Sequence, residues 1–216
     1  MILEGLRFEE DLMILNHPKT PGLYLLCTAD YDPRYDLDKE KFYRQNVLAM
    51  INTKVPDDPC NNAREVSKAG AIEGYGPTLY DSVMELTNGI INDRSSVSND
   101  AKRVMQRYKD TRPDVNKKLL DNIEDLDLYP MTADTDDDCR PGDMATFNGG
   151  VEVSSKDKGL FVDNPLSYSY NKELTPVVTN WKEKGDEFIK HFESRADLFY
   201  TDLRQWGSRM FEDSQL

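Results

Sequence analysis

The stretch of sequence that decides the fold is Gly74-Tyr75-Gly76-Pro77-Thr78-Leu79-Tyr80. Its two glycines favour a tight turn in which the backbone can come close to a ligand, and Pro77 suits the start of a helix because its missing N–H costs nothing there. Apolar residues at helical spacing follow as far as Asn88-Gly89, a typical helix end. The stretch therefore predicts a turn that opens a helix, with free N–H groups and the positive end of the helix dipole at its start.

Extended segments are predicted on both sides of this helix. Before it, 47–51 is a continuous apolar run between turn formers, which indicates a buried strand, and 63–71 is a second strand or extended segment. After it, Ile90-Ile91 begins a short strand, and Ser98-Asn99-Asp100 caps a second helix that Pro113 ends. That helix carries Ala101, Val104, Met105 and Tyr108.

Two further strands complete the pattern. Residues 115–123 alternate weakly, and 166–170 alternate clearly, with Tyr168 and Tyr170 on one face. Because helices and strands follow each other along the chain, the sequence predicts an α/β (α+β) fold.

The two ends of the chain differ from this middle part. Residues 1–46 are dense in turn formers and charge, so we expect an extended arm with a short strand at 24–27 and a short helix near 39–45. Residues 47–175 form the main domain, and 176–216 carry a long amphipathic helix for which Asn180 and Glu183 form a capping box. Gly185 is the weak point of this helix. Its apolar stripe comprises Phe188, Phe192, Phe199, Leu203, Trp206 and Met210.

This stripe has two interpretations: it folds back on its own domain, or it docks into another chain.

Charge is concentrated in one segment. The chain has 216 residues and a net charge of −13, and 121–143 holds nine acidic side chains against the single base Arg140. A surface of this sign repels phosphate, which argues against direct contact with nucleic acid or an anionic membrane, and no apolar run is long enough to span a bilayer. The acidic loop 121–143 is instead expected to be solvated or to contact a basic partner.

Metal and nucleophile chemistry find little support. Asp134, Asp136 and Asp138 match the first ligands of a calcium loop, but the sixth position is Cys139 rather than glycine and the twelfth is Ala145 rather than glutamate. We therefore expect no metal site. Only two histidines are present, and three distant cysteines fit neither a disulfide framework nor a zinc site, so a reducing compartment is the simplest assumption. These residues are His17, His191, Cys27, Cys60 and Cys139.

The order of strand, Gly-rich turn, helix, short strand and second helix resembles the GNAT acyltransferases. More narrowly, Glu73-Gly-Tyr-Gly-Pro-Thr-Leu-Tyr-Asp-Ser-Val-Met-Glu85, Asn92-Asp-Arg-Ser-Ser-Val-Ser98 and Asn164-Pro-Leu-Ser-Tyr-Ser-Tyr170 look like GNAT-like proteins encoded by tailed bacteriophages. The resemblance spans about residues 47–170. It implies a GNAT-like mixed sheet with flanking helices.

The resemblance also implies a site. In that family the turn and its helix hold the pyrophosphate of acetyl-CoA, and the next helix places a tyrosine near the thioester sulfur. Carried over, the cofactor-binding residues are Gly74, Tyr75, Gly76 and Thr78, and Tyr108 is the candidate acid.

This chain departs from the family pattern in three places. Ala71 stands where an arginine or glutamine usually opens the Gly-rich motif, Pro77 removes one N–H from the anion cradle, and Met105 occupies the position of the general-acid tyrosine. The leading hypothesis is therefore a virion-associated or interaction protein with degenerate or absent catalysis, which needs no cofactor.

Two alternatives stay open. One is an acetyl-CoA-dependent N-acyltransferase acting on a host or phage amine, and the other is an acidic protein that binds a basic partner through 121–143. For the leading hypothesis the expected partners are other phage structural proteins or copies of itself, contacted through the C-terminal helix. The expected location is the virion or the host cytoplasm.

Overall fold

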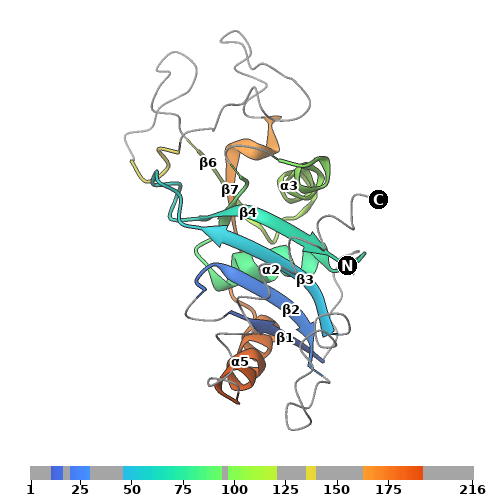
Figure 1. Ribbon diagram of the computed structural model, residues 1–216. Helices are drawn as coiled ribbons and strands as arrows, with labels where there is room; N and C mark the ends of the chain where they lie inside the picture. The colour runs from blue at the N-terminus through green and yellow to red at the C-terminus, as the bar shows by residue number, and fades with distance from the viewer. Residues whose placement is uncertain are drawn as a thin grey trace. The chain divides into compact units, whose positions relative to one another are not determined.

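In the part of the chain that the structure describes, seven strands form one mixed sheet, with the hydrogen-bonded order β1-β2-β3-β4-β5-β7-β6. The computed structural model describes residues 11–16, 20–29, 46–93, 97–120, 135–139 and 163–191 (Figure 1). The predicted α/β class with a mixed sheet is confirmed. Within the described residues, no helix is both long and apolar enough to cross a lipid bilayer.

The chain divides into two units, each made of segments that are separated in the sequence. The first unit takes in Met1–Asn52, Lys68–Ser82 and Leu174–Leu216, and the second takes in Thr53–Ser67 and Val83–Glu173. The division passes through β3, β4 and α2, so sequence neighbours belong to different units.

The sheet of the first unit begins earlier than the sequence indicates. Strands β1 (Leu12–Leu15), β2 (Leu23–Thr28) and β3 (Val47–Lys54) pair antiparallel in succession, with Met13 opposite Cys27 and Leu25 opposite Met50. Leu12–Leu15 and Leu23–Thr28 therefore belong to the sheet and not to an irregular arm. The strand expected at 24–27 lies inside β2, while the helix expected near 39–45 falls outside the described residues.

The predicted strand, turn and helix are all present around the decisive stretch. Strand β4 (Arg64–Ala71) leads through the turn into helix α2 (Gly76–Leu86). Gly74 has a φ of 90°, a left-handed conformation that only glycine adopts without strain. The Ile72 N–H donates to the Leu48 carbonyl at 2.8 Å, which fixes the start of the turn against β3.

The second unit contains the remaining strands. Strand β5 (Ile90–Ile91) pairs parallel with β4 and antiparallel with β7 (Tyr168–Asn171), which in turn pairs antiparallel with β6 (Asn116–Leu119). Gly89 has a φ of +116°, and a Cβ there would lie 2.6 Å from the Tyr170 carbonyl oxygen. Glycine is therefore required where β5 approaches β7.

Two strands predicted in this unit have different first or last residues in the structure. Helix α3 (Asn99–Thr111) begins as expected, because the Ser98 hydroxyl accepts the Ala101 N–H at 3.2 Å. However, the strand expected at 115–123 is only β6, and the first residues of the strand expected at 166–170 form the 3₁₀ helix η2 (Pro165–Ser167). The prediction that Tyr168 and Tyr170 share a face agrees with their ring centroids, which lie 6.3 Å apart.

The C-terminal helix α5 (Pro176–His191) starts before the predicted cap. Thr175 lies at its N-terminus: its hydroxyl accepts the Val178 N–H at 3.4 Å, and Pro176 follows at a position that needs no N–H. Asn180 is instead an exposed residue inside the helix, so the Asn180 capping box is wrong. Residues 192–210 of the predicted stripe lie outside the described residues.

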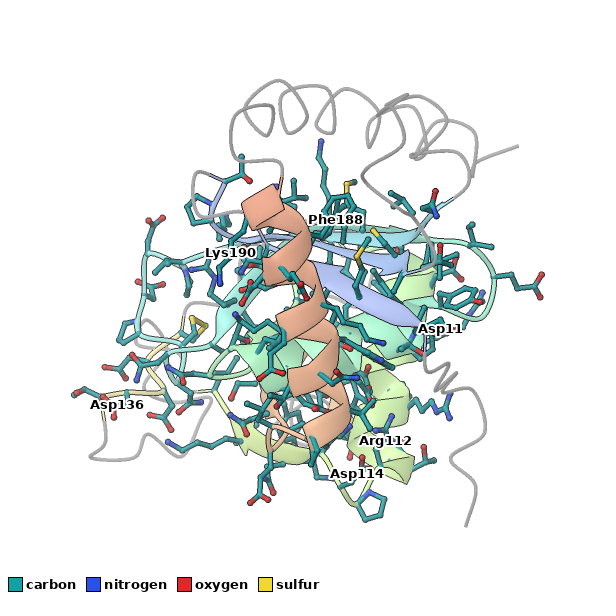
Figure 2. The ribbon with its side chains drawn as sticks, turned by 90° about the horizontal axis from the view of Figure 1, so that it is seen from below. Asp11, Arg112, Asp114, Asp136, Phe188 and Lys190 are labelled. Atoms are coloured by element: carbon teal, nitrogen blue, oxygen red, sulfur yellow. A yellow bond between two sulfur atoms is a disulfide. The ribbon has the colours of Figure 1, made fainter. Side chains whose placement is uncertain are left out.

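Helix α5 packs against β1 in the first unit (Figure 1). Its apolar face is buried, whereas Lys190 is exposed; Phe188 and Lys190 are labelled in Figure 2. The described part of the stripe therefore folds back on its own unit. The buried residues of this face are Val178, Trp181, Phe188 and Ile189.

Gly185 is the point of closest approach between α5 and β1, and not merely a weak point of the helix. A Cβ at this position would overlap the carbonyl oxygen of Ile14 and lie 2.7 Å from its carbonyl carbon. Because strand backbone cannot yield as a flexible side chain can, only glycine lets the helix lie this close.

Replacing this glycine tests the contact. In an open helix Gly→Ala stabilises by roughly 1 kcal/mol, but Gly185→Ala should destabilise the protein by about 1–3 kcal/mol because the new methyl group overpacks the contact. Urea unfolding measures the change. Asn180→Ala, an exposed site on the same helix, is the control and should be neutral or stabilising. A Gly185→Ala variant more stable than the wild type would contradict the packing.

Candidate functional site

The predicted pyrophosphate cradle at the start of α2 has lost part of its donor row. Of the four N–H positions at this helix end, Pro77 has no N–H, and the Tyr75 N–H donates to the Ile72 carbonyl at 3.1 Å. The Leu79 N–H makes the first regular helix bond, to the Tyr75 carbonyl at 3.0 Å. An anion at this helix end would therefore have fewer free N–H donors than the four that an ordinary helix start provides.

The two glycines of the turn have different roles. Gly74 is required by its left-handed φ, so the chain geometry alone explains it. Gly76 has no such conformation, and a Cβ there would make only an ordinary contact, 3.7 Å from the Ala71 Cβ. The fold therefore tolerates a side chain at Gly76.

The other two predicted cofactor residues are turned into the protein. The exposed fractions of Tyr75 and Thr78 are 8% and 2%. The Thr78 carbonyl accepts the Ser82 hydroxyl at 2.8 Å within the helix. Both residues contribute to packing of the first unit, which leaves Gly74 and Gly76 as the accessible part of the turn.

Tyr108, the candidate acid, belongs to the second unit, whereas the turn belongs to the first. Its side chain is 1% exposed, with its ring centroid 5.8 Å from that of Tyr170. The Arg112 guanidinium lies over its ring at 5.6 Å from the centroid. Met105, at the family's acid position, is also buried, with 1% exposed. The structure thus packs Tyr108 among rings and a guanidinium in the interior.

A chain of ionic groups continues from this tyrosine. Arg112, 2% exposed at its side chain, makes two hydrogen bonds to the Asp114 carboxylate at 2.8 and 2.7 Å (Figure 2). Lys172 lies 3.9 Å from the same carboxylate and 2.5 Å from the buried Glu85. Each buried charge therefore has an opposite charge beside it, as burial demands.

The hydrogen bonds from Arg112 hold the pKa of Asp114 below its ordinary value of 3.8. Burial raises the pKa of Tyr170, whose hydroxyl donates to the Pro165 carbonyl at 2.6 Å. These groups stay ionised and protonated respectively at neutral pH, which is suited to a structural role.

The cysteines correct the sequence analysis. Cys60 and Cys139, 79 residues apart, form a disulfide with their Cα atoms 4.6 Å apart, inside a buried cluster with Ala63, Ile91 and Leu120. The expectation that no disulfide forms is wrong, so the cysteines no longer support the assumption of a reducing compartment. Cys27 is free and fully buried, and burial raises its thiol pKa, so it is no nucleophile.

The disulfide holds residues 135–139 of the acidic segment close to the turn at Cys60 and Asn61, within the second unit. The Asn61 N–H donates to the Asp136 carbonyl at 2.6 Å, and Asp137 is buried, with 5% exposed. The expectation of a solvated loop therefore fails for Asp137; residues 121–134 and 140–143 lie outside the described part. In the residues that the structure describes, no three His, Cys, Asp or Glu side chains are grouped to hold a metal ion.

Sequence reasoning missed a polar cavity beside this disulfide. Its volume is about 470 Å³, and its lining has five asparagines, one serine, two lysines and one aspartate, all in the second unit. Each asparagine stands in a turn or at a strand end, where it is normally explained by backbone preference. The asparagines are Asn61, Asn62, Asn88, Asn116 and Asn171.

Comparison of the chain with protein-family models, curated proteins and solved structures finds no match in any of the three. The residues themselves must therefore carry any functional argument.

The Arg112–Asp114 pair predicts an acid-sensitive contribution to stability. Because the folded-state pKa of Asp114 is lowered, its contribution is present above the unfolded-state pKa of about 3.9 and is lost as pH falls through the folded-state value. Asp114→Asn should lower the free energy of unfolding at neutral pH and show a weaker loss on acidification. Urea unfolding across the acid range measures this. Glu187→Gln, an exposed site on α5, should behave as the wild type, and equal acid sensitivity in Asp114→Asn would refute the assignment.

The disulfide makes a second prediction. Thiol titration of unreduced, denatured protein should find one thiol per chain, Cys27, and reduction should raise this to three. Replacing both Cys60 and Cys139 by serine should cost about 2–4 kcal/mol of stability, because the unfolded chain regains the freedom of a long loop. Reductant should lower wild-type stability and leave the double variant unchanged. Three thiols before reduction would disprove the bond.

Proposed function

We propose that the chain is an interaction protein built on a GNAT-like domain, of the tailed-bacteriophage kind that its sequence resembles, and that it does not transfer acyl groups. The element order supports the GNAT-like part of this proposal: β4, the Gly-rich turn, α2, β5 and α3 follow one another as the resemblance implies. The parallel pairing of β4 with β5 makes strand, helix and strand a βαβ unit.

The observation that carries the proposal is the shortened donor row at the start of α2. Backbone N–H groups at a helix end bind phosphate because several point at it together. Here Pro77 has none and the Tyr75 N–H is bonded to Ile72. A cofactor that depends on its pyrophosphate for binding loses much of its affinity at such a turn.

The candidate acid supports the same conclusion. A general acid must come within hydrogen-bond reach of the leaving group. Tyr108 is 1% exposed and contacts the Tyr170 ring and the Arg112 guanidinium, while Met105 has no proton to donate. Partner contact is supported by two exposed apolar residues near the start of α5, Leu174 and Val177, which are 54% and 41% exposed.

One observation favours the alternative of an acetyl-CoA-dependent acyltransferase. Gly76 is not demanded by its conformation or by its neighbours, so the absence of a side chain there leaves room for a ligand to approach the backbone.

Ligand-induced thermal stabilisation distinguishes the two functions. Under the interaction proposal, neither acetyl-CoA nor desacetyl CoA raises the melting temperature at millimolar concentration. A rise in melting temperature with either ligand that the Gly76→Ala substitution abolishes would favour the acyltransferase hypothesis instead. The same substitution should leave the unliganded melting temperature unchanged or higher, because the fold has room for the methyl group. Pro77→Ala restores an N–H, and a gain of CoA binding in this variant would show that the proline is what closes the cradle.

A further inference from the structure

The polar cavity of the second unit has the size of a ligand site. Its 470 Å³ falls in the range of small-molecule pockets, and its lining is drawn from segments far apart in sequence, around 61, 88, 117, 136 and 170. The Cys60–Cys139 disulfide links the segments around 61 and 136, so these two parts of the cavity wall are held together by a covalent bond.

The amide groups of the lining are oriented before any ligand arrives. The Asn61 side chain donates to the Ser169 hydroxyl at 3.0 Å, and the Asn171 side chain donates to the Asn88 carbonyl at 2.9 Å. Their amide nitrogens are thus held by the protein. The Asn61 Oδ1 is buried and has no hydrogen-bond partner among the described residues, an arrangement that costs free energy unless something donates to it.

The backbone at this wall is also held in an uncommon conformation. Asn61 and Asn62 both have positive φ, 55° and 57°, which few residues other than glycine and asparagine adopt. Two consecutive residues of this kind direct both side chains from one short turn, and both line the cavity.

The charges of the lining select against an ionic ligand. Lys117 and Lys118 disfavour a cation, while Asp136 and the chain's net charge of −13 disfavour an anion. Among the described residues, no aromatic ring lines the cavity, so these residues offer a nucleobase or other flat ring nothing to stack on. An uncharged ligand that both donates and accepts many hydrogen bonds fits these groups.

We propose that this cavity binds a short neutral saccharide of one or two residues. Sugar hydroxyls donate to carboxylate and amide oxygens and accept from amide and ammonium groups, which matches asparagine, aspartate and lysine together. This site lies in the second unit and does not depend on the function of the turn at Gly74–Gly76.

Ligand-observed saturation-transfer NMR on the intact, oxidised protein tests the proposal. The probes are glucose, galactose, N-acetylglucosamine and maltose, with glucuronate as the anionic match to glucose. At least one neutral sugar should receive saturation and show saturable binding, and glucuronate should bind more weakly than glucose. Absence of transfer to all four neutral sugars, or tighter binding of glucuronate, overturns the proposal.

Two variants locate the binding. Asn62→Gly removes an amide while keeping a residue that accepts the positive φ, and Asn116→Ala removes an exposed amide on β6. Each should weaken binding roughly threefold to tenfold, as the loss of one or two hydrogen bonds implies. Asn180→Ala, on α5 and outside the cavity lining, should bind as the wild type. Melting curves check that both variants are folded, and if one unfolds the other decides. Unchanged affinity in a folded variant would place the sugar elsewhere and refute the site.

Discussion

The parallel pairing of β4 with β5 is the constraint on which the rest of the structure depends. Only two residue pairs make it, Arg64 with Ile90 and Glu65 with Ile91, supported by the Arg64 N–H bonded to the Gly89 carbonyl at 2.9 Å. Parallel neighbours in a sheet cannot be joined by a hairpin, so the chain must cross over, and α2 is that crossover. The turn at Gly74 and the helix start at Gly76 are therefore consequences of strand direction, whatever ligand they do or do not bind. On the other side of β5, β7 approaches so closely that residue 89 must be glycine.

The buried charges near Tyr108 form a connected series in which each has an oppositely charged neighbour. Lys172 pairs with both Glu85 and Asp114, and Asp114 also pairs with Arg112. The Arg112 guanidinium in turn lies over the Tyr108 ring. Each charge in such a series is costly alone and tolerable only with its neighbours. The cavity beside the disulfide differs, because an amide oxygen there is left without a donor in the described part of the chain.

Sequence reasoning predicted the elements whose signals are local and missed those that depend on distance. Ser98 and Gly89 mark their helix ends through chemistry that acts within a few residues, and α2 and α3 lie where expected. Thr175-Pro176 is the same kind of signal, and it was overlooked because Asn180 with Glu183 imitates a capping box. Strand β1 was missed because four apolar residues next to turn formers give no periodicity. The Cys60–Cys139 bond and the cavity have no local signal, because their residues meet only in the folded chain. Asn61, Asn62 and Asn116 are ordinary turn and strand-end residues until their side chains are seen to share one cavity.

The position of the disulfide also determines how the protein responds to cleavage. Residues 61–138, including the acidic stretch between 121 and 134, lie within the loop that the Cys60–Cys139 bond closes. A protease that makes one cut in this interval leaves the two fragments joined through the disulfide as one covalent molecule, heavier only by the water added, and reduction removes that covalent link. A cut on the C-terminal side of residue 139 produces a fragment with no covalent link to the rest of the chain, held only by non-covalent contacts such as those of β7 and α5. The chain thus has one long interval in which it can be nicked without losing a fragment, and its most acidic stretch lies inside that interval.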